Sequence, residues 1–208
     1  MKGYELLEQL SSGHACDTWD AWSEERGCRV IVRTGDVRRE GRLLQRLTHP
    51  NIVRVYEVHR AWLVLETLSG STLSALPALE RDDAIEMGRQ LCSAVGYLHR
   101  KGWLHLDLKP DNLIADGGRL KVIDFSIAQR PGRVEAGTGT RRWMAPEQVR
   151  GEGVTAATDV WGIAAVLRAA GLEYEVAEDP AERPAVADVI RWLDGLPSPG
   201  PARPRQAA

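Results

Sequence analysis

Apolar residues in the first seventy positions come in short runs that are separated by turn-forming polar residues. This pattern predicts strands at residues 4–10, 16–22, 28–33, 52–58 and 61–66. Between the third and fourth runs, Val37, Leu44 and Leu47 recur at helical spacing, and Asp36 precedes them as a capping residue. We therefore expect a β-rich opening segment with one helix, capped by Asp36 and ending near Leu47.

The apolar spacing becomes helical after residue 69. Residues 82–101 carry apolar side chains on one face, and Gly102 follows as a helix stop. Short apolar runs at 113–115 and 120–123 flank Asp116-Gly117-Gly118, which predicts a hairpin. Residues 124–147 show little periodicity over more than the usual loop length, which indicates a functional segment. Further helices are expected at 158–170 and 185–193.

The chain carries no sequence signal for a membrane or for export. No stretch approaches the ~18 apolar residues of a membrane span, and acidic residues stand where a signal peptide would be apolar. The three cysteines form no CxxC motif, which favours a reducing compartment. The proline-rich end, residues 197–208, is expected to be a disordered tail. We therefore expect a cytoplasmic protein with no membrane partner.

Charge and length narrow the classes of function. The 27 Lys and Arg residues face 29 Asp and Glu residues, so an electrostatic nucleic-acid binder is not expected. The 208 residues, of which 43% are hydrophobic, suffice for one domain or for one domain in two lobes. Only four residues are lysines, so a function that needs a lysine has few candidates: Lys2, Lys101, Lys109 and Lys121.

One cluster of polar residues matches the needs of phosphoryl transfer. Asp107, Lys109 and Asn112 follow a predicted helix, and Asp124 follows the predicted hairpin that returns the chain toward them. Phosphoryl transfer requires metal ions on the phosphates, a cation on the moving group and a carboxylate at the attacking hydroxyl. Carboxylate and amide oxygens are the ligands that Mg²⁺ prefers. This set therefore predicts a phosphotransferase site.

The same residues lie in motifs that resemble the eukaryotic-type protein kinase family, as found in bacterial Ser/Thr kinases. His105 to Asn112 matches the catalytic-loop pattern, Asp124-Phe125-Ser126 resembles the metal-binding motif, and residues 139–147 resemble the end of an activation segment. Later motifs follow in family order at Asp159 and at Arg183. The resemblance covers about residues 4–195. It implies an α+β, bilobal fold: a small β-rich N-lobe with one helix at 1–68 and a reduced, mainly helical C-lobe at 69–196.

The resemblance also implies a role for each matching residue. Asp107 would orient the substrate hydroxyl, and Lys109 would neutralise the γ-phosphate. Asn112 and Asp124 would hold Mg²⁺ or Mn²⁺ on bound ATP. Three further residues would contribute to nucleotide binding in the N-lobe: Gly13, Arg33 and Glu40. His105 is expected to pack and hydrogen-bond, and Phe125 to lie in the core.

Several positions depart from the family pattern. The glycine-rich loop aligns as Ser11-Ser12-Gly13-His14-Ala15-Cys16, which keeps only the middle glycine, and Arg33 replaces the lysine of the third strand. Leu106 replaces the arginine before Asp107, so a phosphate on the activation segment lacks its usual partner. Asp159 and Arg183 are only 24 positions apart, so the helices that form a substrate-docking surface are largely missing.

The sequence leaves more than one function open. The first expectation is a Ser/Thr protein kinase that phosphorylates protein hydroxyls, and the alternative is a pseudokinase that acts as a nucleotide-binding or regulatory module. A small-molecule kinase is a third reading. Thr138 and Thr140 are either phosphorylation sites or structural residues. Because a short C-lobe exposes apolar surface, we also expect an oligomer such as a dimer, or a bound protein partner.

Overall fold

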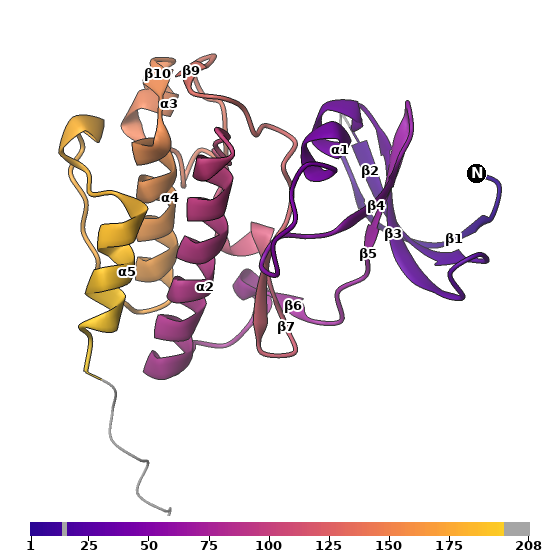
Figure 1. The fold of residues 1–208 in the computed structure, drawn as a ribbon, viewed down its shortest axis with the longest axis horizontal. Coiled ribbons are helices and arrows are strands. Elements are labelled where there is room, and N and C mark those ends of the chain that lie inside the picture. The colour runs from indigo at the N-terminus through magenta and orange to yellow at the C-terminus, as the bar shows by residue number, and fades with distance from the viewer. Residues whose placement is uncertain (14–15, 198–208) are drawn as a thin grey trace, which may run out of the picture.

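The computed structural model describes residues 1–13 and 16–197, and its first part is one antiparallel sheet (Figure 1). The strand order β1-β2-β3-β5-β4 places β3 at the centre, as expected for its β-branched residues. The five strands are β1 (Tyr4–Ser12), β2 (Cys16–Ser23), β3 (Cys28–Gly35), β4 (Val55–Val58) and β5 (Trp62–Glu66). The fourth predicted strand is shorter than expected, because Ile52 instead bridges to Val122 in the second part of the chain.

The predicted helix after β3 forms, but its ends differ from the prediction. The helix α1 spans Arg38–Leu44, and its N-cap residue is Val37, which provides no side-chain hydrogen bond. The prediction that Asp36 caps this helix is therefore wrong. The backbone N–H of Leu47 bonds to the carbonyl of Leu44 in a tighter turn after the helix. Apolar spacing continued to Leu47 because this turn keeps the same side facing the core.

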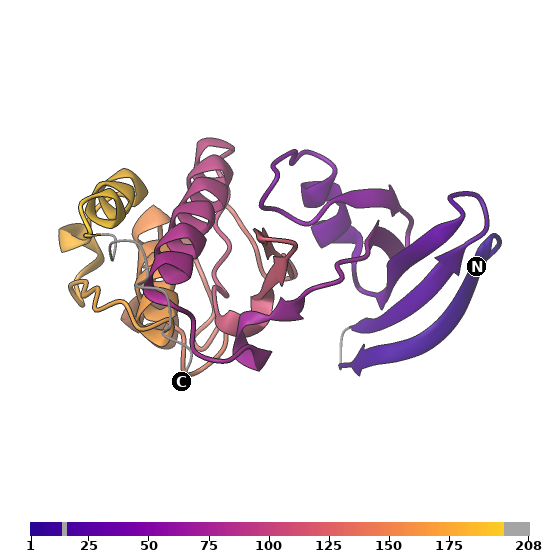
Figure 2. The ribbon, with the colours of Figure 1, turned by 90° about the horizontal axis from the view of Figure 1, so that it is seen from below.

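The second part of the chain is mainly helical. Figures 1 and 2 show three helices packed side by side: α2 (Arg81–Arg100), α4 (Ala156–Ala169) and α5 (Val186–Asp194). A small sheet joins them to the first part, and it consists of β6 (Ser71–Thr72), β7 (Leu113–Asp116) and β8 (Arg119–Val122). The predicted hairpin is β7 and β8, and Gly102 ends α2 with φ +76°, as predicted.

Short elements complete this part, and the sequence patterns did not predict most of them. Before the helix that begins at Pro146, the segment 124–147 contains β9 (Gly132–Arg133), which pairs with β10 (Gly153–Val154). The one-and-a-half-turn helix α3 (Pro146–Arg150) follows and ends at Gly151 in a left-handed conformation. Three 3₁₀ turns lie at Leu73–Ala75 (η1), Pro110–Asn112 (η2) and Pro180–Glu182 (η3).

The main hydrophobic cluster of the described residues connects α1 and the inner face of the sheet with α2, α4 and α5. Phe125 is 1% exposed and lies within this core, as predicted. Within residues 1–13 and 16–197, no helix has the length and apolar character needed to cross a membrane. The predicted tail lies outside the described residues except for Pro197. The fold is a mixed α+β arrangement.

Candidate active site

The loop that carries Asp107 is held in place from α4. The carboxylate of Asp159 accepts hydrogen bonds from the backbone N–H groups of His105 at 2.9 Å and of Leu106 at 2.8 Å. Leu106 has φ +68°, a conformation that a branched side chain adopts only when its surroundings impose it. A hydrogen bond between Nε2 of His99 and Oδ2 of Asp159, at 2.8 Å, fixes the same carboxylate from α2. The loop is therefore preorganised by two helices.

His105 is a structural residue of this loop. It is fully buried, its Nε2 lies 3.2 Å from the carbonyl of Ile123, and its Nδ1 accepts the N–H of Asp107 at 3.3 Å. Since Nε2 must donate to the carbonyl while Nδ1 accepts, both contacts fit one neutral tautomer. Its ring also packs edge-on against Phe125. His105 thus links Asp107 to the strand that leads to Asp124.

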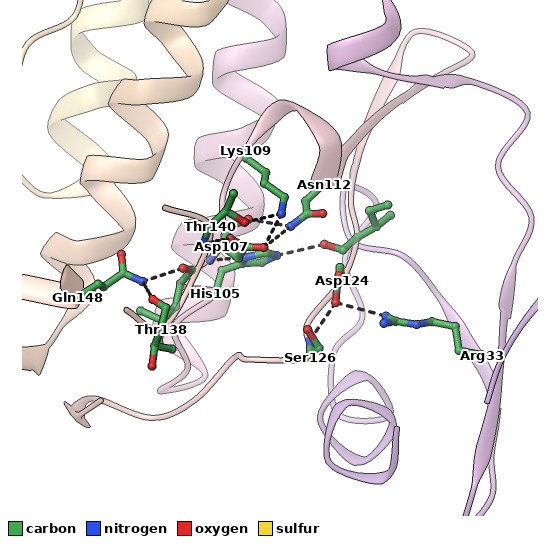
Figure 3. Close-up of polar contacts among 12 residues, drawn as sticks. Arg33, His105, Asp107, Lys109, Asn112, Asp124, Ser126, Thr138, Thr140 and Gln148 are labelled. Carbon is green, nitrogen blue, oxygen red and sulfur yellow. Dashed lines mark hydrogen bonds and ion pairs between the residues drawn. The ribbon is translucent and has the colours of Figure 1, made fainter. Parts of the chain in front are cut away.

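Asp107, Lys109 and Asn112 lie together, as the sequence predicts (Figure 3). The carboxylate Oδ2 of Asp107 accepts the side-chain amide of Asn112 at 3.0 Å and lies 2.9 Å from Nζ of Lys109. Its Oδ1 accepts the backbone N–H of Thr140 at 2.9 Å, and Nζ of Lys109 donates to the Thr140 hydroxyl at 2.5 Å. The carboxylate is therefore fixed in orientation, next to one ammonium group.

Asp124, Arg33 and Glu40 form a second cluster. The guanidinium NH1 of Arg33 lies 2.6 Å from Glu40 on α1 and 3.3 Å from Oδ1 of Asp124. Its NH2 donates to Sγ of Cys16 at 3.0 Å. The backbone N–H of Phe125 donates to the same oxygen of Glu40. The pairing of Arg33 with Glu40 that the sequence suggested is therefore present, and it joins β3, α1 and the segment after β8.

Charges in this second cluster shift the acidity of its members. Burial raises the pKa of Asp124, but the Arg33 guanidinium and hydrogen bonds from Ser126 more than reverse this, so the pKa lies below its usual value. Burial also raises the pKa of Glu40, which is 2% exposed, and the Arg33 charge offsets only part of that rise. The net result keeps Asp124 anionic and the Arg33 guanidinium charged.

A cavity of 530 Å³ lies between the sheet and the small sheet of the second part. Polar side chains from both clusters line it: Arg33, Asn112 and Asp124, together with Gly13, Cys16 and Glu66. Its other walls are mostly apolar and include Ile31, Val53, Leu65 and Ile123. This size and lining are typical of a small-molecule site that holds an apolar ring and a charged group.

The donor set in this cavity fits a nucleotide with a hard metal ion. One amide oxygen, of Asn112, and one carboxylate, of Asp124, line the same space, and these are Mg²⁺ ligands. Within the described part of the chain, no group of three or more His, Cys, Asp or Glu residues could hold a metal. Phosphate oxygens and water would therefore complete the coordination. The buried Nε of Arg33 has no acceptor among the described residues, and a phosphate oxygen would supply one.

Two residues support this region to which the sequence analysis gave no place in the site. The side-chain amide of Gln148 donates to the carbonyls of Leu106 at 2.8 Å and of Thr138 at 2.9 Å, which ties α3 to the loop of Asp107. Lys121, on β8, is 8% exposed and pairs with Glu66 at 2.6 Å. A lysine within the predicted apolar run 120–123 was a usable signal for Lys121, whereas no sequence signal marked Gln148.

Comparisons with known proteins give the family of this fold and site. A model of the protein kinase domain matches residues 24–191. CBL-interacting protein kinase 19 of Oryza sativa is 33% identical over 79% of this chain and 38% of its own length. CBL-interacting serine/threonine-protein kinase 21 of Arabidopsis thaliana is 37% identical over 79% of the chain and 45% of its length, and human myosin light chain kinase 3 is 33% identical over 71% and 20%. The chain thus spans less than half of each of these relatives, and it belongs to the protein kinase domain family.

Proposed function

We propose that this chain is a Ser/Thr protein kinase that transfers the γ-phosphate of ATP to hydroxyl groups of proteins. The observation that carries this proposal is the arrangement around Asp107: its carboxylate accepts bonds from Asn112 and Thr140 and lies beside Nζ of Lys109. A lysine two positions after the aspartate, together with Thr140, is typical of Ser/Thr rather than Tyr kinases. The Ser/Thr kinases among its relatives support the same assignment.

Each site residue has a part in this reaction. Asp107 orients the attacking hydroxyl and receives its proton, while Lys109 lies where negative charge accumulates on the transferred phosphoryl group. Asn112 and Asp124 would hold Mg²⁺ or Mn²⁺, which neutralises phosphate charge when it is bound. The lowered pKa of Asp124 supports metal binding, because the group stays ionised at neutral pH.

Arg33 and Gly13 would bind the nucleotide from the sheet side. Glu40 orients the Arg33 guanidinium, and the free Nε of Arg33 is a donor for a phosphate oxygen. Gly13 lines the cavity and donates its backbone N–H to the carbonyl of Cys16. An arginine supplies a planar fork rather than a point charge, so we expect weaker or slower use of ATP than in a kinase with a lysine at this position.

The two parts of the fold correspond, in this proposal, to the lobes of a bilobal kinase. Residues 1–68 form the N-lobe and 69–196 form a reduced C-lobe. The 24-position interval between Asp159 and Arg183 supports the reduction, because it leaves room only for the end of α4, a loop and η3. We expect a protein substrate, and a regulatory partner or a second copy, to contact this C-lobe. Relatives named for their interaction with CBL support a partner-regulated kinase.

Transfer of label from ATP tests the proposal. The purified chain is incubated with γ-labelled ATP, Mg²⁺ or Mn²⁺ and a general protein acceptor, and compared with Asp107→Ala. Asp111→Asn is the matched control, because Asp111 is an exposed carboxylate in the same loop. We expect labelling to fall at least a hundredfold in Asp107→Ala and to stay within threefold in Asp111→Asn. Equal labelling by wild type and Asp107→Ala would end the enzyme assignment.

One observation favours a second candidate, a pseudokinase that binds nucleotide without efficient transfer. Cys16 stands where the family has a glycine. Its Sγ accepts a hydrogen bond from NH2 of Arg33, which could otherwise donate to a phosphate. Thermal unfolding with millimolar ATP and Mg²⁺ separates the cases, since a ligand that binds only the folded state must raise the Tm. A Tm rise without labelling supports the pseudokinase, and no rise would argue against both.

A further inference from the structure

A hollow of 380 Å³ lies on the outer side of α1 and shares no lining residue with the nucleotide cavity. We call it the α1 hollow. Its lining contains four arginines and one aspartate, so it carries a net charge of +3, and one leucine and one tryptophan complete it: Asp36, Arg38, Arg39, Arg42, Leu43, Arg46 and Trp103. The positive charge is concentrated on nine consecutive positions of a chain whose net charge is −2.

The arginines of the α1 hollow have no partners within residues 1–13 and 16–197. Arg38, Arg39, Arg42 and Arg46 are exposed and form neither an ion pair nor a side-chain hydrogen bond there. Arg38 and Arg42 lie four positions apart on α1, and like charges at this spacing destabilise a helix, while Arg46 lies in the turn that follows. An anion bound between them would reduce that repulsion, because no described residue forms an ion pair with these arginines.

The shape and the residue types of the hollow indicate which anion fits. Guanidinium groups bind phosphate through two parallel hydrogen bonds, which a lysine cannot do. The half-buried Trp103 provides an apolar wall beside the arginines, and the guanidinium of Arg130 lies 5.3 Å from the centre of its ring. A phosphorylated side chain on a peptide presents both a phosphate and an apolar stem to such a wall.

Two other anionic partners fit less well. A membrane surface would require large apolar side chains beside the arginines, but the exposed ones in the described part of the chain lie elsewhere: Met1, Leu6, Leu7, Leu10, Trp22 and Val149. A nucleic acid would require an extended basic face, whereas these arginines occupy one short helix and its following turn. We propose that the α1 hollow binds a phosphorylated segment of a partner protein.

Binding at the α1 hollow would also act on the candidate active site. Glu40 is on α1, and its Oε1 holds both Arg33 and the N–H of Phe125. A ligand that relieves the repulsion on α1 stabilises this helix and therefore the contact between Glu40 and Arg33. This regulatory consequence rests on the proposed kinase function, whereas the binding does not.

Fluorescence anisotropy without ATP tests the binding. The probe is a fluorescein-labelled acidic peptide that carries one phosphoserine, and its comparison is the same peptide without phosphate. We expect the full chain to bind the phosphopeptide at least tenfold more tightly than its twin. Arg42→Glu/Arg46→Glu should reduce this affinity at least tenfold, and the milder Arg42→Gln/Arg46→Gln at least threefold. Circular dichroism checks that each variant folds.

The control reverses two charges outside the hollow. Arg60 and Arg81 are exposed and unpaired among the described residues, so Arg60→Glu/Arg81→Glu matches the change in net charge and should alter affinity less than twofold. Equal loss in both double variants, or equal binding of the two peptides, would overturn the proposal. The proposal would also be overturned if the phosphopeptide did not bind while phosphatidylserine vesicles or duplex DNA bound in a way that depends on Arg42 and Arg46. Because no ATP is present, absence of kinase activity leaves these outcomes unaffected.

Discussion

Removing the Arg183 side chain tests whether one buried ion pair holds the segment around η3 to the helix α3. Its guanidinium makes a bidentate contact with Glu147, at 2.7 and 2.8 Å. The remaining donors reach three backbone carbonyls, those of Ala157 at 3.1 Å, Ala177 at 2.9 Å and Glu178 at 2.6 Å. One side chain thus satisfies acceptors on α3, α4 and the loop before η3.

The expected loss of stability follows from the burial of this pair. The side chains of Arg183 and Glu147 are 0% and 1% exposed, so Arg183→Met would leave a buried carboxylate without its counter-charge. Removing one partner of such a pair costs about 3–5 kcal/mol. For a chain of this size about 1 kcal/mol corresponds to ~2–4 °C, so the Tm should fall by about 6–20 °C.

Urea unfolding followed by circular dichroism measures this loss, with ATP omitted. Arg191→Met is the control, since Arg191 is 75% exposed and pairs with an exposed carboxylate, and it should change little. The double variant Glu147→Met/Arg183→Met should lose less than the sum of the two single variants, because no unpaired charge remains. A loss under ~1 kcal/mol in Arg183→Met, or additive losses in the double variant, would refute this reasoning.

Three further predictions address the site, the packing and the dependence on pH. Arg33→Lys should keep or raise ATP-dependent labelling, and a total loss would identify Arg33 as an adapted residue. Gly70→Ala should lower the free energy of unfolding in urea by about 1–3 kcal/mol, because its Cβ would collide with the carbonyl oxygen of Ala115, whereas Gly153→Ala, with open space around it, should not. Contacts with Arg183 and Thr158 outweigh burial and lower the pKa of Glu147, so the folded state binds this proton less tightly than the unfolded state. Ionised Glu147 therefore stabilises the fold above about pH 4.5, and this effect is lost as the pH falls through its lowered pKa. Between about pH 5 and 3 the Tm should fall less in Glu147→Gln than in the wild type, and an equal fall in both would contradict this.

The regular elements were predictable because local spacing determines them. The β-branched run of β3 and the apolar face of α2 each follow from a single period, and Gly102 marks the end of α2 by its own backbone freedom. The cap of α1 was not predictable in the same way. Asp36 is a suitable residue type, but the N-cap is the next residue, Val37, whose buried side chain fixes the start of the helix.

The residues of the site were found through their motifs, whereas the contacts that hold them were not. The order of Asp107, Asn112 and Asp124 along the chain is a local signal. The side-chain amide of Gln148 donates to the carbonyl of Leu106, which is 42 positions away in the sequence, and neither periodicity nor composition predicts a contact at that separation. The helix α3 is missed for a related reason, since its five residues, which begin with a proline, provide too little apolar spacing to stand out.

Two departures from the family pattern that look independent in the sequence are in contact in the structure. Cys16 replaces a glycine and Arg33 replaces a lysine, and the Sγ of one accepts the NH2 of the other at 3.0 Å. A glycine at position 16 would leave that nitrogen without its present acceptor. A lysine at position 33 would present one ammonium group in place of the two nitrogens that now contact Glu40, Asp124 and Cys16. The guanidinium fork therefore suits the altered loop. This contact argues that the two departures are coupled around Arg33, with Glu40 and Asp124 kept in place, rather than independent changes.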